Sequence, residues 1–269
     1  MSCYFNMVVT EEAIPTAPKI IAPKFNCDYS LGDKIPEPLP RGSFFWSVIG
    51  APGSGKSSYL ISLLTARRPN RAYRGIFEDV YFVVPPASQA SLGSSLFIEH
   101  DQTKIYPELT GDTLKEILGR VEAAAAEDCS SLLVLDDVTA SLKDKEVEKL
   151  LRLMAFNRRH LHLSIFLLSQ NYNQIPLSVR KCFSHYSMFK TSNKKEFENI
   201  FQELIYQPKD VADEIVRFVF RDKRDTLFGD VASGKLYRNF NLLRIGNEDE
   251  GCRPGNSGRK CRKGEEDKE

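Results

Sequence analysis

The residues with the clearest chemical meaning form a glycine-rich loop near residue 50. The run from Gly50 to Ser57 is GAPGSGKS and fits the phosphate-binding pattern GxxxxGK[ST] at every fixed position. Glycines in such a loop let successive backbone N–H groups converge on phosphate oxygens, and the dipole of the following helix adds positive potential. The pattern therefore predicts a site for a nucleoside triphosphate, with ATP as the expected nucleotide.

Two side chains at the end of this loop have separate predicted roles. Lys56 supplies a mobile cation to the β- and γ-phosphates and so takes part in catalysis, and the Ser57 hydroxyl is a predicted Mg²⁺ ligand. Ser58 is expected to begin the helix that follows. The full predicted nucleotide-binding set is Gly50, Ala51, Pro52, Gly53, Ser54, Gly55, Lys56, Ser57 and Ser58. A plain glycine-rich turn is the alternative, but the loop lies between an expected strand and an expected helix, which favours the nucleotide site.

Two adjacent aspartates follow a continuous apolar run further along the chain, in the segment SLLVLDD. A P-loop ATPase needs a carboxylate in the Mg²⁺ shell, and Asp136 is placed for that role. We predict that Asp137 orients or deprotonates the attacking water. Because Asp also caps helices and opens turns, the pair takes its meaning from the phosphate loop upstream.

One polar residue and three arginines complete the candidate catalytic set. Gln170 follows another apolar run, at the strand end where ligands bind to parallel sheets, and could sense the γ-phosphate or position the water. A strand that simply leaves the core is the alternative. An arginine from a neighbouring copy can stabilise the charge that develops in phosphoryl transfer. Arg159 is the candidate, Arg158 and Arg180 remain open, and a solvated helix end would explain each of them equally simply.

The expected secondary structure places these residues at one edge of a sheet. The expected strands are continuous apolar runs, at residues 44–49, 80–84, 132–135, 163–168 and 186–189. The expected helices are at residues 56–66, 113–126, 144–158, 193–205 and 208–219. A hairpin of strands 227–230 and 236–242 closes the pattern. Strands alternating with helices predict an α/β fold, with a mainly parallel central sheet flanked by helices and a small C-terminal helical and hairpin region.

Composition divides the chain into four parts. Residues 1–40 hold six prolines and little periodicity, so we expect an extended N-terminal arm. Residues 41–190 form the expected P-loop ATPase core, and residues 191–245 supply helices and a hairpin that complete the domain. Residues 246–269 are rich in Gly, Lys, Arg and Glu, without an aliphatic residue, and predict a disordered charged tail.

The whole-chain totals bound the class of protein. The formal charge is only +1, so any DNA contact needs local basic patches or a ring of copies whose fields add. Candidate patches are Lys190 with Lys194 and Lys195, and the run Arg221–Arg224, although acids interrupt both and a solvated face is the plainer interpretation. Six scattered cysteines indicate reduced thiols. With no secretory signal and no apolar run of membrane-spanning length, we expect a soluble intracellular protein.

Three segments together resemble a known family. GAPGSGKS, LLVLDDV and FNRRHLHLSIFLLSQNYNQIP are similar to the motifs of poxvirus-type genome-packaging ATPases of nucleocytoplasmic large DNA viruses, within the FtsK–HerA superfamily. The resemblance covers about residues 44–190. It implies an ASCE-type ATPase core in which Lys56 and Ser57 bind phosphate and Mg²⁺, Asp136 binds Mg²⁺, Asp137 is the catalytic acid and Gln170 is the sensor.

The resemblance also implies a function. It implies an ATPase that forms ADP and phosphate, is stimulated by DNA, and translocates double-stranded viral DNA into a preformed capsid. The implied assembly is a homo-oligomeric ring, a pentamer or hexamer, with capsid or portal-vertex proteins as partners, in the virion and the host-cell cytoplasm (the virus factory). A P-loop phosphotransferase and an ATP-gated scaffold stay open as alternatives. Gln170 favours the motor over the first, and the Asp136–Asp137 pair argues against the second.

Overall fold

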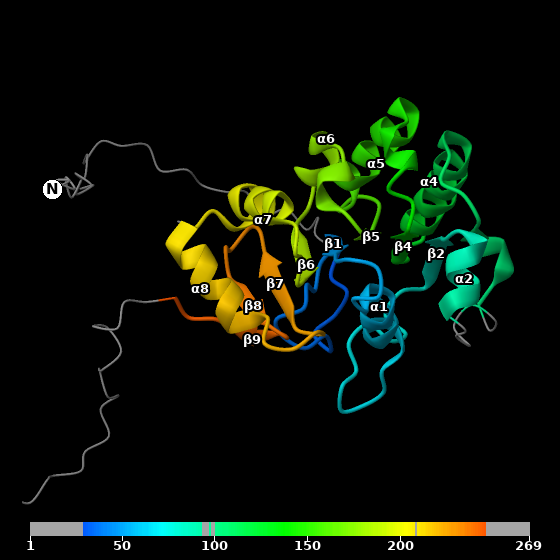
Figure 1. Ribbon diagram of the computed structural model, residues 1–269. Coiled ribbons are helices and arrows are strands. Elements are labelled where there is room, and N and C mark those ends of the chain that lie inside the picture. The colour runs from blue at the N-terminus through cyan, green and yellow to red at the C-terminus, as the bar shows by residue number, and fades with distance from the viewer. Residues whose placement is uncertain (1–28, 93–96, 98–99, 208, 246–269) are drawn as a thin grey trace, which may run out of the picture.

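A nine-stranded sheet forms the centre of the computed structural model, which describes residues 29–92, 97, 100–207 and 209–245 (Figure 1). The strand order is β3-β2-β4-β5-β1-β6-β7-β8-β9. Strands β1 to β6 pair in parallel, and β7 to β9 add antiparallel partners beyond β6. The strands are β1 Phe45–Ile49, β2 Asp79–Val83, β3 Ile105–Tyr106, β4 Ser131–Asp136, β5 Leu163–Ser169, β6 His185–Phe189, β7 Thr226–Asp230, β8 Leu236–Arg238 and β9 Asn241–Leu242.

Helices cover both faces of this sheet, as expected for a parallel sheet (Figure 1). The α-helices are α1 Lys56–Thr65, α2 Pro86–Leu92, α4 Gly111–Ala126, α5 Lys145–Asn157, α6 Leu177–Arg180, α7 Lys194–Ile200 and α8 Lys209–Val219. Short turns of helix are η1 Gln102–Lys104, η2 Ser141–Lys143, η3 Tyr172–Gln174 and the π-helical η4 Phe201–Ile205. In Figure 1, α4, α5 and α6 lie on the opposite side of the sheet from α1.

Alternation along the strands divides the core into two clusters, one on each face of the sheet. In β1, Phe45 and Ile49 pack with buried residues of α4, α5 and α8. Their neighbours Trp46 and Val48 pack on the other face with buried residues of α1. Strands that bury both faces are continuous apolar runs in sequence, which is why the core strands could be predicted.

The predicted α/β class and the parallel core are confirmed, and the differences lie at the periphery. Pro86, soon after the end of β2, begins the helix α2. The backbone N–H of a first helical residue has no partner within the helix, so a proline there costs no hydrogen bond. The prediction of one strand over 236–242 is wrong. Asn239 and Phe240 adopt positive φ angles of 48° and 69°, and this turn separates β8 from β9.

The part of the predicted N-terminal arm that is described, residues 29–40, lies against the sheet. Leu31, Ile35 and Leu39 are buried in the cluster that contains α1. The Tyr73 hydroxyl donates a hydrogen bond to the carbonyl of Pro40 at 3.0 Å. Residues 1–28 and the predicted tail, 246–269, lie outside the described residues. Among the described residues, no helix combines the length and the apolar character needed to cross a membrane.

Candidate active site

The phosphate loop connects the end of β1 to the start of α1, as its sequence context predicted. Gly53 and Gly55 adopt positive φ angles of 71° and 108°, which side chains other than glycine rarely tolerate. A Cβ on Gly50 would lie 2.6 Å from Ser54 Oγ and 3.0 Å from the Cβ of Phe189. The glycines are therefore required both by the backbone conformation and by close packing around the loop.

Lys56 is the first residue of α1, and it is only 8% exposed. Its Nζ donates hydrogen bonds to the carbonyls of Gly50 at 2.7 Å and Ala51 at 3.3 Å. Burial lowers the pKa of Lys56, while the nearby carboxylates of Asp136 and Asp137 oppose that shift. The cation is thus held by loop carbonyls, which phosphate oxygens can replace as acceptors.

Asp136 ends β4 next to the first turn of α1. The Ser57 hydroxyl donates a hydrogen bond to Asp136 Oδ2 at 3.0 Å. Burial raises the pKa of Asp136, and the Ser57 hydrogen bond and the Lys56 charge only partly offset it. A hydroxyl beside a buried carboxylate with an unfavourable charge is an oxygen donor set that fits Mg²⁺.

The two oxygen donors of Ser57 and Asp136 also indicate how the ligands of Mg²⁺ would be divided between the protein and a nucleotide. Among the described residues, no group of three or more His, Cys, Asp or Glu side chains is arranged to hold a metal ion. Mg²⁺ usually keeps several waters and uses one or two carboxylates together with substrate phosphates. Ser57 and Asp136 therefore fit a Mg²⁺ that is completed by a bound nucleotide rather than by the protein alone.

Asp137 leaves the strand in a left-handed conformation, with φ 57°. Asp tolerates this region better than most residues, and such backbone is often found at functional sites. Its Oδ1 accepts a hydrogen bond from Gln170 Nε2 at 2.8 Å, and its Oδ2 accepts one from Ser88 Oγ at 3.3 Å. The carboxylate that we predicted to orient water thus contacts the residue that we predicted to be the sensor.

The strand order explains this contact. β5 lies between β1, which leads into the phosphate loop, and β4, which ends in the acidic pair. Parallel strands end at the same edge of a sheet, so Gln170 follows β5 between the loop and Asp137. The separation of the two motif strands by one intervening strand agrees with the ASCE-type core that the resemblance implied.

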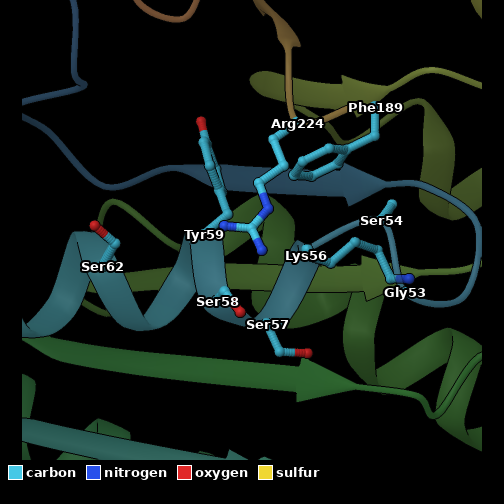
Figure 2. Close-up of a pocket in the computed structure, with 10 residues that line it drawn as sticks. Gly53, Ser54, Lys56, Ser57, Ser58, Tyr59, Ser62, Phe189 and Arg224 are labelled. Carbon is cyan, nitrogen blue, oxygen red and sulfur yellow. The ribbon is translucent and has the colours of Figure 1, made fainter. Parts of the chain in front are cut away.

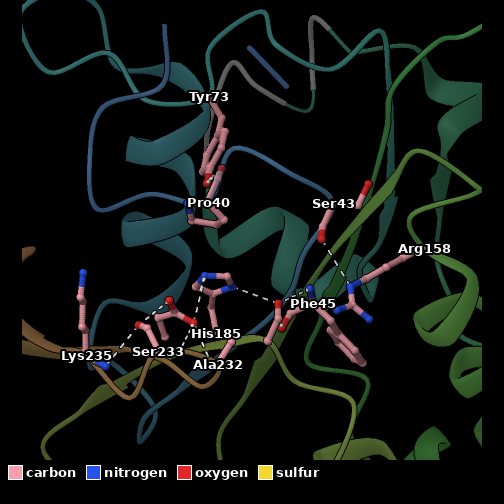
Figure 3. Close-up of polar contacts among 11 residues, drawn as sticks. Pro40, Ser43, Phe45, Tyr73, Arg158, His185, Ala232, Ser233 and Lys235 are labelled. Atoms are coloured by element: carbon pink, nitrogen blue, oxygen red, sulfur yellow. Dashed lines mark hydrogen bonds and ion pairs between the residues drawn. The ribbon is translucent and has the colours of Figure 1, made fainter. Parts of the chain in front are cut away.

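The candidate arginines lie elsewhere and differ in their surroundings. Arg158 and Arg159 follow α5 and precede β5, at the amino edge of the sheet. Arg158 Nη1 donates to the Ala155 carbonyl at 2.8 Å. Its Nε donates to the Ser43 carbonyl at 3.3 Å, as Figure 3 shows. Burial lowers the pKa of Arg158, and the charge of Arg159 adds to that shift. Arg158 is therefore partly enclosed by its own chain, whereas Arg159 is exposed.

Arg180 is also held within its own chain. Its Nη1 donates to Glu203 Oε1 at 2.7 Å and to Oε2 at 2.8 Å, and its guanidinium lies over the ring of Tyr172, 4.8 Å from the centroid. The side chain of Arg180 is only 13% exposed. These contacts hold the Arg180 guanidinium inside its own subunit, whereas an arginine that acts in a neighbouring copy must be accessible, so they disfavour Arg180 for that role.

His185 lies at the start of β6, on the same amino edge, and its contacts indicate a structural role. Its Nδ1 hydrogen-bonds with the Ser184 hydroxyl at 2.9 Å, and this hydroxyl accepts the N–H of Phe45 at 2.9 Å (Figure 3). Burial lowers the pKa of His185 to about 4, although Asp230 opposes the shift. The imidazole is therefore neutral at neutral pH and offers no charge for binding phosphate.

Three residues near the loop were missed in the sequence. Ser88 lies on α2, a helix that was not predicted. Phe189 ends β6 and packs on the phosphate loop, and Arg224 joins it in lining a cavity beside α1 (Figure 2). The sequence placed Arg224 in a candidate DNA patch, but it lies beside the phosphate loop. Only the long-range pairing of β6 with β1 and β7 brings Phe189 and Arg224 there.

Solved structures confirm the fold. Genome-packaging NTPase B204 from Sulfolobus turreted icosahedral virus 2, in complex with sulfate, shares 17% identity with a TM-score of 0.54, over 73% of this chain and 95% of that one. The complex of the same protein with ATP-gammaS shares 16% identity with a TM-score of 0.51, over 75% of this chain and 98% of that one. B204, the DNA-packaging ATPase from Sulfolobus turreted icosahedral virus, shares 17% identity with a TM-score of 0.53, over 76% of this chain and 98% of that one. These values establish a shared P-loop NTPase architecture.

Comparison at the level of sequence families gives a more specific result. No curated protein sequence matches the chain. The sequence profile described as Poxvirus A32 protein matches residues 36–225, which is more than half of the chain and includes the phosphate loop, the acidic pair and Gln170. The match also extends beyond the segments that carried the resemblance, through α7 and α8. The chain belongs to the poxvirus A32 protein family.

Proposed function

We propose that this protein is an ATP-driven motor that translocates double-stranded viral DNA into a preformed capsid. The observation that carries the proposal is the contact between Gln170 and Asp137, which directly follow the adjacent strands β5 and β4 near the phosphate loop. A residue that touches the water-activating carboxylate is suited to report whether the γ-phosphate is present. Membership of the poxvirus A32 protein family and the fold shared with genome-packaging NTPases support the same reading.

Nucleotide binding rests on the loop and on Lys56. In this proposal, ATP phosphates accept hydrogen bonds from backbone N–H groups of the loop, such as those of Gly53 and Gly55, and from Lys56 Nζ, which now donates to the carbonyls of Gly50 and Ala51. The other residues of the predicted nucleotide-binding set lie in the same loop or, like Ser58, in the first turn of α1. Ser57 and Asp136 would hold Mg²⁺, which when bound supplies positive charge beside the phosphate oxygens.

Hydrolysis follows from the position of Asp137. Its carboxylate accepts a hydrogen bond from the attacking water and aligns the water oxygen in line with the bond between the γ-phosphorus and ADP. The new P–O bond forms as the bond to ADP breaks, and the water proton passes to Asp137 or to the released phosphate. Gln170, already in contact with Asp137, loses its phosphate partner when phosphate leaves. This change is the proposed signal for movement.

The site is completed by a second copy. Arg159 lies at the amino edge of the sheet, and β5 separates it from the carboxyl edge by about 20 Å, at roughly 3.3 Å per residue. It is therefore too far away to reach its own γ-phosphate, but it can enter the site of a neighbour. We propose a homo-oligomeric ring of five or six copies around the DNA, in which Arg159 stabilises charge in the neighbouring site.

The wider setting of this motor is part of the proposal. A ring that fills a capsid must dock on capsid or portal-vertex proteins, and it acts where virions assemble, in the cytoplasm of the host cell. Because the chain has a formal charge of +1, the fields of several copies would have to add in the central channel to attract DNA. DNA binding should therefore depend strongly on assembly and on salt.

Translocation can be measured directly by displacement of a third strand from a DNA triplex. A motor that moves along duplex DNA removes the third strand when ATP is supplied, and the Asp137→Asn variant should bind ATP without removing it. Displacement that needs ATP hydrolysis supports the proposal. Hydrolysis without displacement would leave an ATPase that is not a motor, and phosphate transfer to an acceptor would indicate the phosphotransferase instead.

A further inference from the structure

A cavity of about 480 Å³ lies beside the phosphate loop, on the side of α1 that faces β6 (Figure 2). Its lining includes the first turn of α1 with Ser57 and Ser58, the rings of Tyr59 and Phe189, and the side chain of Arg224. In Figure 2, the guanidinium of Arg224 lies over the start of α1, between Tyr59 and Phe189. The cavity has the size of a small-molecule site, and it is continuous with the residues that bind phosphate.

The aromatic walls of this cavity are fixed by buried contacts. The Tyr59 hydroxyl and Ser187 Oγ are 2.9 Å apart, and Trp46 Nε1 donates to the same Ser187 oxygen at 3.0 Å. The ring of Tyr59 stacks on Phe240, with centroids 5.8 Å apart. Phe189 is 3% exposed and meets Tyr59 edge to face at 5.9 Å. These rings form a rigid apolar wall, which suits the flat base of a nucleotide.

The loop that carries Arg224 is held by one buried carboxylate. Asp225 is 5% exposed and accepts four hydrogen bonds. The donors are the backbone N–H groups of Arg221 at 3.0 Å and Asp222 at 2.8 Å, with Arg238 Nη2 at 2.9 Å and Asn239 Nδ2 at 2.7 Å. The arginine next to this clamp is thus presented from a defined backbone, which reduces the entropy lost when it binds a ligand.

The charge of Arg224 has no counterpart of its own in the part of the chain that the structure describes. No ion pair there joins it to a carboxylate, although Arg180 and Arg238 each have one. Lys56 is the other cation in the lining of the cavity. A guanidinium binds phosphate oxygens through a planar fork of donors, so an unpaired arginine next to a phosphate loop favours an anionic ligand.

We propose that Arg224 binds the nucleotide within its own subunit, at the α-phosphate, while the base and ribose occupy the cavity between Tyr59 and Phe189. The inference rests on the proposed function, since it assumes that ATP binds at the phosphate loop. It gives the segment between α8 and β7 a role in binding nucleotide, in place of the DNA contact that its charges suggested. Arg224 differs in role from Arg159, because the α-phosphate is present before and after hydrolysis.

The affinities for ATP and for ADP distinguish the role of Arg224 from that of Arg159. Both affinities can be measured with fluorescent nucleotide analogues on the full-length assembled protein. Arg224→Ala should weaken both about 10- to 100-fold, the loss expected for a charge-assisted bidentate contact. It should raise KM by the same factor and leave kcat at saturating ATP within about twofold. Arg224→Lys should recover part of the affinity, because it keeps the charge but loses the fork. Arg217→Ala, on the exposed face of α8, is the matched control and should change neither value.

Each other outcome would overturn the inference in a recognisable way. Unchanged affinity for both nucleotides in Arg224→Ala would mean that the side chain does not touch the ligand. A lower kcat with unchanged ADP affinity would place Arg224 at the γ-phosphate instead. An equal loss in Arg224→Ala and Arg224→Lys, together with a lower Tm, would assign it to folding. If the wild-type protein itself binds neither nucleotide, the proposed function fails rather than this inference alone.

Discussion

The two edges of the central sheet differ in what they offer a nucleotide. At the carboxyl edge, Ser57 at the end of the phosphate loop donates a hydrogen bond to Asp136, and Gln170 donates one to the adjacent Asp137. At the amino edge, Arg158 is bound to backbone carbonyls, and Arg159 is exposed about one strand length away. One subunit therefore carries the residues predicted to bind nucleotide and activate water at one edge and its candidate stabilising arginine at the other, and in the proposed ring these two sets meet only between neighbouring copies.

The largest expected effect belongs to the carboxyl edge. Lys56→Ala removes the cation that is buried inside the phosphate loop, and we expect kcat/KM for ATP hydrolysis to fall by at least about 10³-fold. Phosphate release measured over a range of ATP concentrations, from well below KM to saturation, tests this. Because the loop glycines and Asp136 remain, the variant should still fold, with a Tm near that of the wild type. Steady-state hydrolysis at the wild-type rate would mean that the active site is elsewhere.

Arg159→Ala tests the amino edge. We expect kcat to fall by about 10³-fold, as for the loss of an arginine that acts in trans, with ATP affinity unchanged. Arg152→Ala, at an exposed arginine on the preceding helix α5, is the control and should keep its activity. The sharper test mixes inactive Arg159→Ala with inactive Lys56→Ala. A mixed ring contains complete sites and should regain activity, whereas no recovery would contradict a shared site.

Gln170→Ala breaks the contact that carries the proposed function. Its Nε2 donates to Asp137, so its loss leaves the carboxylate less well oriented. We expect kcat to fall by about 10- to 100-fold, since positioned proton acceptors contribute about that much or more. Coupling gives a second readout, because the sensor should affect DNA movement per ATP more than hydrolysis itself. A variant that hydrolyses slowly but moves DNA with normal efficiency would show that Gln170 is not the sensor.

Arg180→Ala should act on stability and not on catalysis. Its contacts with Glu203 and Tyr172 are internal, so truncation should lower the free energy of unfolding by about 1–3 kcal/mol, the usual cost of leaving a partly buried polar group without its partner. Denaturant unfolding measures that loss. The hydrolysis rate of the folded protein should stay within about twofold of the wild type. A large fall in kcat at unchanged stability would make Arg180 a rival to Arg159.

The smallest expected effect is that of Asp136→Asn on the stability of the ligand-free protein, and its size depends on pH. Burial raises the pKa of Asp136 in the folded state, so ionisation opposes folding when neither Mg²⁺ nor nucleotide is present. Stability from this group is highest below the ordinary pKa and falls as pH rises through the raised value. Asp136→Asn should therefore unfold a few degrees above the wild type at neutral pH, and the gap should close near pH 4. A variant that is less stable at neutral pH would contradict this account.

The carboxyl edge was largely predictable from sequence, because its chemistry is local. The phosphate loop and the two aspartates each follow a buried strand, and the residue types identify them without knowledge of their neighbours. Their contact with Gln170 depends on β5 lying between β1 and β4, a pairing that the resemblance to a family implied and that apolar patterning alone does not specify. The roles of these residues stay predictions until the variants are measured.

The residues around Arg224 show where sequence reasoning ended. A basic run after a helix has the composition of a solvated face, and only the pairing of β7 with β6 brings it to the phosphate loop. Similarly, Phe240 adopts a positive φ that bulky residues seldom take, so nothing in its type predicted the turn that separates β8 from β9. Long-range pairing and backbone exceptions, rather than the core, account for what was missed.

Phosphate release by the purified protein, with and without linear double-stranded DNA, is the most direct test of a DNA motor. We expect that DNA increases the rate several-fold, that the increase falls with rising salt, and that Asp137→Asn abolishes it while still binding ATP. Hydrolysis at the same rate with and without DNA, in protein shown to be assembled, would contradict a DNA motor and leave only the ATPase.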